Sequence, residues 1–64
     1  MFVLLTNASP GFEGLPVAIN FKNIVSVFES KNAETGEVST VVYSNDNNWV
    51  VQESVAEVVA KLSI

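Results

Sequence analysis

The chain has 64 residues, of which 48% are hydrophobic and only 16% are charged, and its formal net charge is −4 with a pI near 4.3. This composition lies outside the polar, highly charged range of disordered segments, and the length allows only one domain, a β-rich unit over residues 1–64. The absence of cysteine and histidine excludes disulfides and the zinc and copper sites built from those residues. It also fits a cytoplasmic location, which we expect.

The basic residues are too few for a nucleic acid partner. Lys22, Lys31 and Lys61 are the only ones, whereas neutralising phosphates requires clustered lysine and arginine. The apolar start of the chain, residues 1–5, lacks a positively charged segment and breaks at Thr6-Asn7, so it predicts neither a signal peptide nor a membrane span. We expect no nucleic acid and no membrane among the partners.

Five segments have the residue types and alternation that favour β-strands, and turn-forming residues separate them. Residues 7–14 form a long loop, residues 21–23 a corner, and Thr35-Gly36 a hairpin turn. Residues 45–48, all Asn or Asp, give the strongest turn signal in the chain. The predicted strands are residues 2–6, 15–20, 24–30, 38–44 and 49–52.

After the last strand the hydrophobic period changes from two to about 3.6, which predicts an amphipathic C-terminal helix. Ser54 and Glu57 have the spacing of a capping box, and Glu53 and Glu57 lie near the positive end of the helix dipole. The predicted fold is therefore α+β, a small antiparallel β-meander of four to five strands with one C-terminal helix. The apolar stripe of that helix is Val55, Val58, Val59 and Leu62.

Four features follow one another along the chain: a first strand that ends in Leu5-Thr6, an Asn20-x-x-x-Ile24 step, a Thr40-Val41-Val42 strand, and the junction Val51-Gln52-Glu53-Ser54-Val55-Ala56-Glu57-Val58. In this order they resemble the FlbD-like family of small proteins, over nearly the whole chain. That family is associated with bacterial flagellar and swarming motility, and similar short chains occur in phages and prophages. The resemblance implies a small accessory protein and supplies no catalytic residue.

The sequence departs from the family pattern at its turns. The loop at 7–14 is longer than the family's tight glycine turn, Phe21 stands where the family often has proline, and residues 45–48 replace Asn-Gly. These departures concern connections between strands, so the resemblance still implies the same fold.

Few side chains remain for enzyme chemistry without histidine or cysteine, and we expect no enzyme, no cofactor and no metal. Glu53 and Glu57 could be a carboxylate pair, but helix capping and the helix dipole account for both. Asp46 and Asn48 lack the EF-hand spacing that a calcium loop requires, so a hairpin turn accounts for them better.

The aromatic residues allow two interpretations. A stacking platform for a sugar or base could be formed by Trp49, Tyr43, Phe21, Phe12 and Phe28. The ligand-binding hypothesis uses Trp49 and Tyr43. Aromatic residues on adjacent strands more often pair across the sheet and fill the core, and we predict that role here. Phe12 differs because it lies in the predicted loop between two glycines, where an exposed phenylalanine is a candidate contact point.

The first, third and fourth predicted strands are apolar on both faces, whereas one short helix covers only one face of a small sheet. In the third strand, Ile24 and Phe28 alternate with Val25 and Val27. Either the sheet closes into a barrel or copies of the chain pack their second faces together, and the small size favours association. An edge at residues 2–6 or 38–44 could also pair with another chain. The interaction candidates are Phe2, Leu4, Phe12, Val25, Val27 and Trp49.

We therefore expect a non-enzymatic, homo-oligomeric interaction module of bacterial or phage origin, FlbD-like, whose acidic surface and 7–14 loop remain for a protein partner. The alternative is an acidic phage-encoded inhibitor that occupies a basic site on a host protein. The salt dependence of binding distinguishes the two hypotheses, because binding through opposite charges weakens as ionic strength rises.

Overall fold

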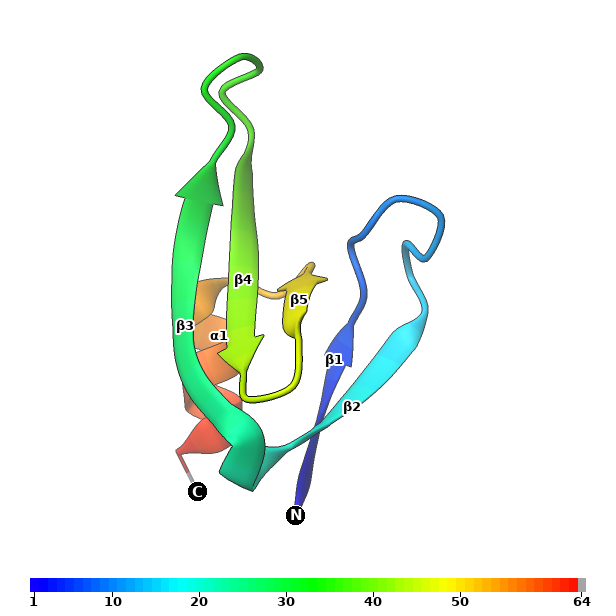
Figure 1. Cartoon of the computed structure of the whole chain (residues 1–64), viewed down its shortest axis with the longest axis vertical. Helices are drawn as coiled ribbons and strands as arrows, with labels where there is room; N and C mark the ends of the chain where they lie inside the picture. The colour runs from blue at the N-terminus through cyan, green and yellow to red at the C-terminus, as the bar shows by residue number, and fades with distance from the viewer. Residues whose placement is uncertain (64) are drawn as a thin grey trace.

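The computed structural model describes residues 1–63 and shows five strands followed by a helix (Figure 1). The α+β class predicted from the sequence, with an antiparallel β-rich body and a C-terminal helix, is confirmed. The elements in chain order are β1 (Phe2–Thr6), β2 (Pro16–Asn20), the 3₁₀ helix η1 (Phe21–Asn23), β3 (Ile24–Lys31), β4 (Val38–Ser44), β5 (Asn48–Val51) and α1 (Val55–Leu62).

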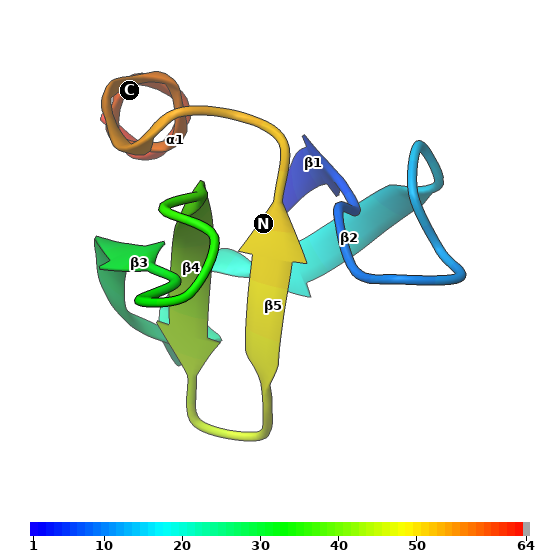
Figure 2. The ribbon, with the colours of Figure 1, turned by 90° about the horizontal axis from the view of Figure 1, so that it is seen from above.

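The strands divide between two antiparallel sheets instead of forming one continuous meander. One sheet has the order β1-β2 and the other the order β3-β4-β5, so β2 and β3 are consecutive in the chain but not paired (Figures 1 and 2). The chain turns a corner between them at η1, where the side chain of Asn20 accepts a hydrogen bond from the Lys22 amide at 3.0 Å. This cap explains why the strand ends at Asn20.

The two sheets meet where β1 ends beside β5. Asn7 forms an isolated antiparallel bridge with Val51, and the Gln52 amide donates to the Thr6 carbonyl at 2.8 Å. The Ala8 amide donates to the carbonyl of Val50 at 2.9 Å. These bonds hold the β1-β2 hairpin against the larger sheet, so the inner faces of both sheets enclose one core.

The core is aliphatic. Leu5, Val42 and Val58 are at most 1% exposed, and Trp49 is the one aromatic residue of the described chain that packs against them, partly buried. The prediction that the aromatic residues fill the core is wrong for Phe21, Phe28 and Tyr43, which are 40%, 45% and 45% exposed. Tyr43 faces outward because side chains alternate along β4 and Val42 takes the inward position. The buried hydrophobic residues are Val3, Leu5, Ile19, Val42, Val51 and Val58.

A β-bulge changes which side chains of β3 face inward. The register with β4 shifts between Ile24 and Ser26, so Val25 is an extra residue and is 58% exposed. Ile24 and Val27 both pack against the core as a result. This arrangement differs from the simple alternation that the sequence predicts, in which Ile24 and Val27 lie on opposite faces.

The helix α1 closes the core by packing against β3 and β1 (Figure 2). The predicted capping box is confirmed: the Glu57 amide donates to Ser54 Oγ and the Ser54 amide donates to Glu57 Oε1, each at 3.1 Å. Val58 is fully buried, whereas Val59 remains 47% exposed although the period places it on the same stripe. One flank of the helix therefore stays uncovered.

Candidate interaction surfaces

The outward side of the β1-β2 hairpin is apolar. Val3 and Leu5 point into the core, whereas Phe2 and Leu4 are 67% and 59% exposed. The register places Leu4 opposite Ala18, so side chains of both strands share this outer side. We call this surface the hairpin face, which consists of Phe2, Leu4, Pro16 and Ala18, all exposed.

A second apolar surface lies on the outer side of the larger sheet. Phe28 is opposite Val41, and Tyr43 is the next residue of β4 on that side. Phe28 and Tyr43 are each 45% exposed, while Val42 between Val41 and Tyr43 points into the core. We call this surface the outer sheet face, defined by Phe28, Val41 and Tyr43.

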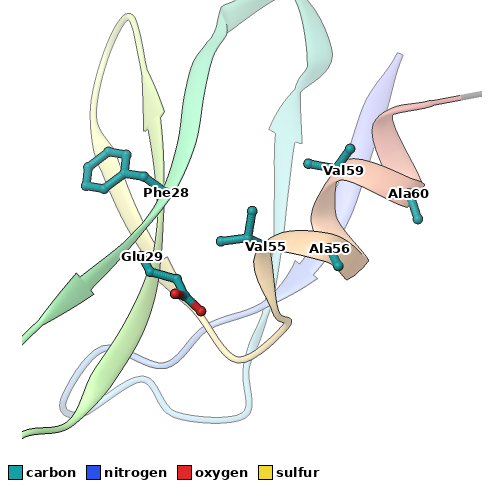
Figure 3. A pocket seen from close by; sticks show the side chains of 6 residues that line it. All are labelled: Phe28, Glu29, Val55, Ala56, Val59 and Ala60. Carbon is teal, nitrogen blue, oxygen red and sulfur yellow. The ribbon is translucent and has the colours of Figure 1, made fainter.

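A groove runs between β3 and the uncovered flank of α1 (Figure 3). Val55 and Val59 extend from the helix toward β3, and the ring of Phe28 turns away from the helix (Figure 3). Because β3 pairs only with β4, its other edge is open, and Phe28 and Glu29 of this strand line the groove. We call it the β3–α1 groove, lined by Phe28, Glu29, Val55, Ala56, Val59 and Ala60.

The six interaction candidates do not form one surface. Phe2 and Leu4 lie together on the hairpin face, and Val25 is exposed at the β3 bulge. Val27 and Trp49 are partly buried and pack against the core from the inner face of the larger sheet. Phe12 lies apart from these residues, in the loop between β1 and β2.

The loop between β1 and β2 presents Phe12. Its ring is 58% exposed, while its backbone is fixed, since the Phe12 amide donates to the Ser9 carbonyl at 2.9 Å and its carbonyl accepts from Leu15 at 3.1 Å. Gly14, just before Leu15, adopts a φ of 83°, a value that favours glycine. Phe12 and Trp49 line one small hollow, so the structure brings these two candidates together.

Trp49 and Tyr43 do not share a surface. Trp49 is opposite Val42 and faces inward, whereas Tyr43 is opposite Asn48 and faces outward. A stacking platform that combines both rings, as the ligand-binding hypothesis requires, is therefore not formed.

The acidic residues have structural partners instead of one another. Thr6 donates two hydrogen bonds to Glu53, from its amide to Oε1 and from Oγ1 to Oε2, each at 2.9 Å. Partial burial acts to raise the pKa of Glu53, but the bonds from Thr6 and from its own amide, with the charge of Lys61, outweigh burial and hold that pKa below the ordinary 4.5. Glu57 serves the helix cap, so the two carboxyl groups have separate roles.

The turn at residues 45–48 is built from hydrogen bonds within the chain. The Asn47 amide donates to Ser44 Oγ, and Ser44 Oγ donates to the Asn47 carbonyl. Across residues 1–63, no three Asp or Glu side chains come close enough to hold a metal ion together.

Comparisons with protein families, with curated proteins and with solved structures found no match to this chain. No helix within residues 1–63 is both long and apolar enough to cross a membrane.

The sequence analysis placed Val59 on the buried stripe of the helix and predicted that Tyr43 fills the core, whereas both side chains are about half exposed. The signal for Val59 was present, because Val58 and Val59 are adjacent and a narrow helix stripe rarely buries two neighbouring residues equally. The same reasoning applies to β4, where strict alternation forces either Val42 or Tyr43 outward.

Proposed function

We propose that this chain is a non-enzymatic interaction module that associates with copies of itself. The observation that carries the proposal is the exposure of large apolar side chains on the outward faces of both sheets. Phe2, Leu4, Phe28 and Tyr43 leave between 45% and 67% of their surface accessible. Contiguous exposed apolar surface on a small protein is typical of contact sites.

The energetics of the small chain support association. Burying apolar surface contributes roughly 25 cal/mol per Å², and a chain of this size has little core to stabilise it alone. The buried core consists of six aliphatic side chains within residues 1–63. Contact between copies would add apolar burial that the isolated chain lacks.

The molar mass in solution tests the proposal. We expect light scattering coupled to size-exclusion chromatography to give a multiple of the chain mass of 6.9 kDa, at low and at high salt alike. Apolar contacts do not weaken as salt rises, unlike contacts between exposed charges. A mass of 6.9 kDa at every concentration and salt level would overturn the proposal.

The FlbD-like resemblance and a bacterial or phage origin belong to this proposal, as does a cytoplasmic location. The support is the order of strand, step and capped helix in the sequence, and the capped helix follows β5 as that pattern implies. Gene neighbourhood tests this part: flagellar genes nearby would support a motility role, and phage structural genes would point to a phage accessory protein.

One observation favours the alternative, an acidic inhibitor of a host protein. The β3-β4 hairpin extends beyond the rest of the molecule, and its turn carries Glu34 and Glu37, both exposed (Figure 1). Such a projection could enter a basic site. In a pull-down from host lysate, this alternative predicts a partner that the Glu34→Gln/Glu37→Gln variant loses and that high salt releases, while Glu13→Gln, also exposed, changes nothing.

A further inference from the structure

We propose that two copies of the chain pair their β3 strands edge to edge, antiparallel, about a two-fold axis at Phe28. This inference rests on the proposed function and names the surface through which the copies meet. The paired strands would join the two β3-β4-β5 sheets into one continuous sheet, with the helix α1 of each copy on the same side of it.

The backbone of β3 offers hydrogen bonds along its open edge. The Asn32 amide donates to the Glu37 carbonyl at 2.8 Å, one step beyond the Lys31–Val38 pair. Asn32 and Glu37 thus form a hydrogen-bonded pair, and hydrogen-bonded and non-hydrogen-bonded pairs alternate along an antiparallel ladder. Counting back from Asn32 in steps of two, Ser30 and Phe28 also bond to β4. Val27 and Glu29 therefore direct their N–H and C=O groups away from β4.

The hydrogen bonds between β4 and β5 lead to the same conclusion about which residues of β3 bond to β4. The Ser44 amide donates to the Asn47 carbonyl at 3.0 Å, which makes Ser44, Val42 and Thr40 the residues of β4 that bond toward β5. The intervening residues of β4 then bond toward β3, and Val41 is the partner of Phe28. The open edge of β3 therefore presents the polar backbone groups of Val27 and Glu29.

The bulge sets the length of strand that can pair. Regular geometry begins at Ser26, after the extra residue Val25, and the strand ends at Lys31. Residues directly opposite each other in an antiparallel pair point to the same face of the sheet. When the two strands are identical and related by a two-fold axis, this condition requires the axis to pass through a residue and not between two residues. The regular segments of the two copies overlap most when the axis passes through Phe28 or Glu29.

Charge selects between these two positions. An axis at Glu29 would place Glu29 directly opposite Glu29 of the second copy, and like charges in directly opposite positions destabilise a sheet. An axis at Phe28 places Glu29 opposite Val27 of the second copy, where the outward backbone groups of the two residues can bond. Phe28 then lies opposite Phe28 of the second copy. The two form a non-hydrogen-bonded pair, the type in which side chains approach most closely.

The side chains around the edge suit this arrangement. On the outer sheet face, the two Phe28 rings would cover each other and reduce the 45% exposure of this side chain. On the other side, the β3–α1 groove would receive β3 of the second copy, and the uncovered helix flank with Val55 and Val59 would face the corresponding flank. Ala56 and Ala60 on that flank are small enough to permit close approach.

A second copy fits this edge better than a strand from a strongly charged protein. Although the whole chain carries −4, β3 itself contains one Glu and one Lys, Glu29 and Lys31, so two copies meet there without net repulsion. A standard interface buries roughly 800 Å² per partner, about a fifth of the 4390 Å² surface of this chain.

Engineered cysteines test the register, because the native chain contains none. Under mild oxidation, Phe28→Cys should give a disulfide-linked dimer of twice the chain mass, since opposite positions in such a pair have the Cα separation that a disulfide requires. Ser26→Cys and Ser30→Cys should stay unlinked as single variants, because Ser26 lies opposite Ser30 of the second copy. The double variant Ser26→Cys/Ser30→Cys should link, and it retains Phe28.

These serines are exposed in the free chain, so their replacement does not disturb its core.

As an independent measurement, amide hydrogen exchange of Val27 and Glu29 should slow as the protein concentration rises. Val59→Lys on the helix flank should lower the average molar mass, whereas Leu4→Lys on the hairpin face should not.

The possible failures are distinguishable. If the wild-type chain is an oligomer but Ser30→Cys links as readily as Phe28→Cys, or none of the variants links, the β3 pairing is wrong and self-association stands. If Leu4→Lys dissociates the oligomer and Val59→Lys does not, the hairpin face makes the contact instead. A wild-type monomer would overturn both proposals.

Discussion

Thr6 holds Glu53 through both its backbone amide and its hydroxyl, with two hydrogen bonds of 2.9 Å that join positions 47 residues apart. Thr6 is the last residue of β1, and Glu53 follows β5 just before the helix cap. The pair therefore stabilises the place where the two sheets and the helix meet. A carboxylate that accepts two hydrogen bonds favours its ionised form, which makes this junction sensitive to acid.

We expect the chain to lose stability as the pH falls below about 4.5. Because folding lowers the pKa of Glu53 below 4.5, the stabilisation from this group is complete above that pH and is lost as the pH falls through the lower pKa of the folded state. Thr6→Val should raise the pKa of Glu53 and cost about 1 kcal/mol at neutral pH. NMR titration of the Glu53 carboxyl and urea unfolding at several pH values measure both effects.

Thr6→Ser is the matched control, since it keeps the hydroxyl donor. It should retain the low pKa of Glu53 and most of the stability at neutral pH. Equal acid sensitivity in the wild-type and Thr6→Val chains would show that the junction does not depend on this bond.

Val58→Ala should destabilise the chain by about 2 kcal/mol, because Val58 is fully buried and its truncation leaves a cavity beneath α1. Val38→Ala removes the same atoms from a side chain that is 58% exposed and should change stability by no more than about 0.5 kcal/mol. Urea unfolding at a fixed protein concentration compares the two. Equal losses would mean that α1 does not cover the core as described.

Ser54→Ala should cost about 1 kcal/mol, since it removes the hydroxyl that accepts the Glu57 amide at 3.1 Å. Ser63→Ala, at the other end of the same helix, should have little effect because the Ser63 backbone amide, not its side chain, bonds to the Val59 carbonyl. The helical signal in circular dichroism during thermal unfolding measures the difference. An unchanged midpoint for Ser54→Ala would contradict the role of the cap.

Phe12→Ser should change the free energy of unfolding by no more than about 0.5 kcal/mol, because the ring is 58% exposed and the loop is held by backbone hydrogen bonds. Molar mass should also stay the same, since the loop is not part of the proposed β3 contact. A large loss of stability would show that the ring covers the core through the hollow it shares with Trp49.

Local sequence patterns predicted the elements well. The strand bounds at residues 2–6 and 38–44 agree with β1 and β4, and the capping pair Ser54 and Glu57 places the start of α1 correctly. These features depend on neighbouring residues, whose alternation, turn preferences and capping are visible in the sequence. The corner at residues 21–23 is likewise local and appears as η1.

The arrangement of the elements was less visible. The bulge at Val25 has no marker such as glycine, and without it Val27 is placed on the wrong side of β3. The β1-β2 hairpin docks on the larger sheet through bonds such as that between Thr6 and Gln52, which lie far apart in the sequence. Glu53 was predicted as a partner of the helix dipole, and its bonds to Thr6 could not be inferred from residues near it.

The β1–helix junction also bears on how the chain folds. The β3-β4-β5 hairpins and the β1-β2 hairpin each form from residues close in sequence, whereas Lys61 Nζ reaches the Leu4 carbonyl at 3.1 Å across 57 positions. Contacts between distant residues require a large loop to close first, which slows folding. We therefore expect refolding kinetics in which two quickly formed pieces dock in a slower step. The amides that bond across the junction, those of Thr6, Ala8 and Gln52, should be the last to gain protection from exchange.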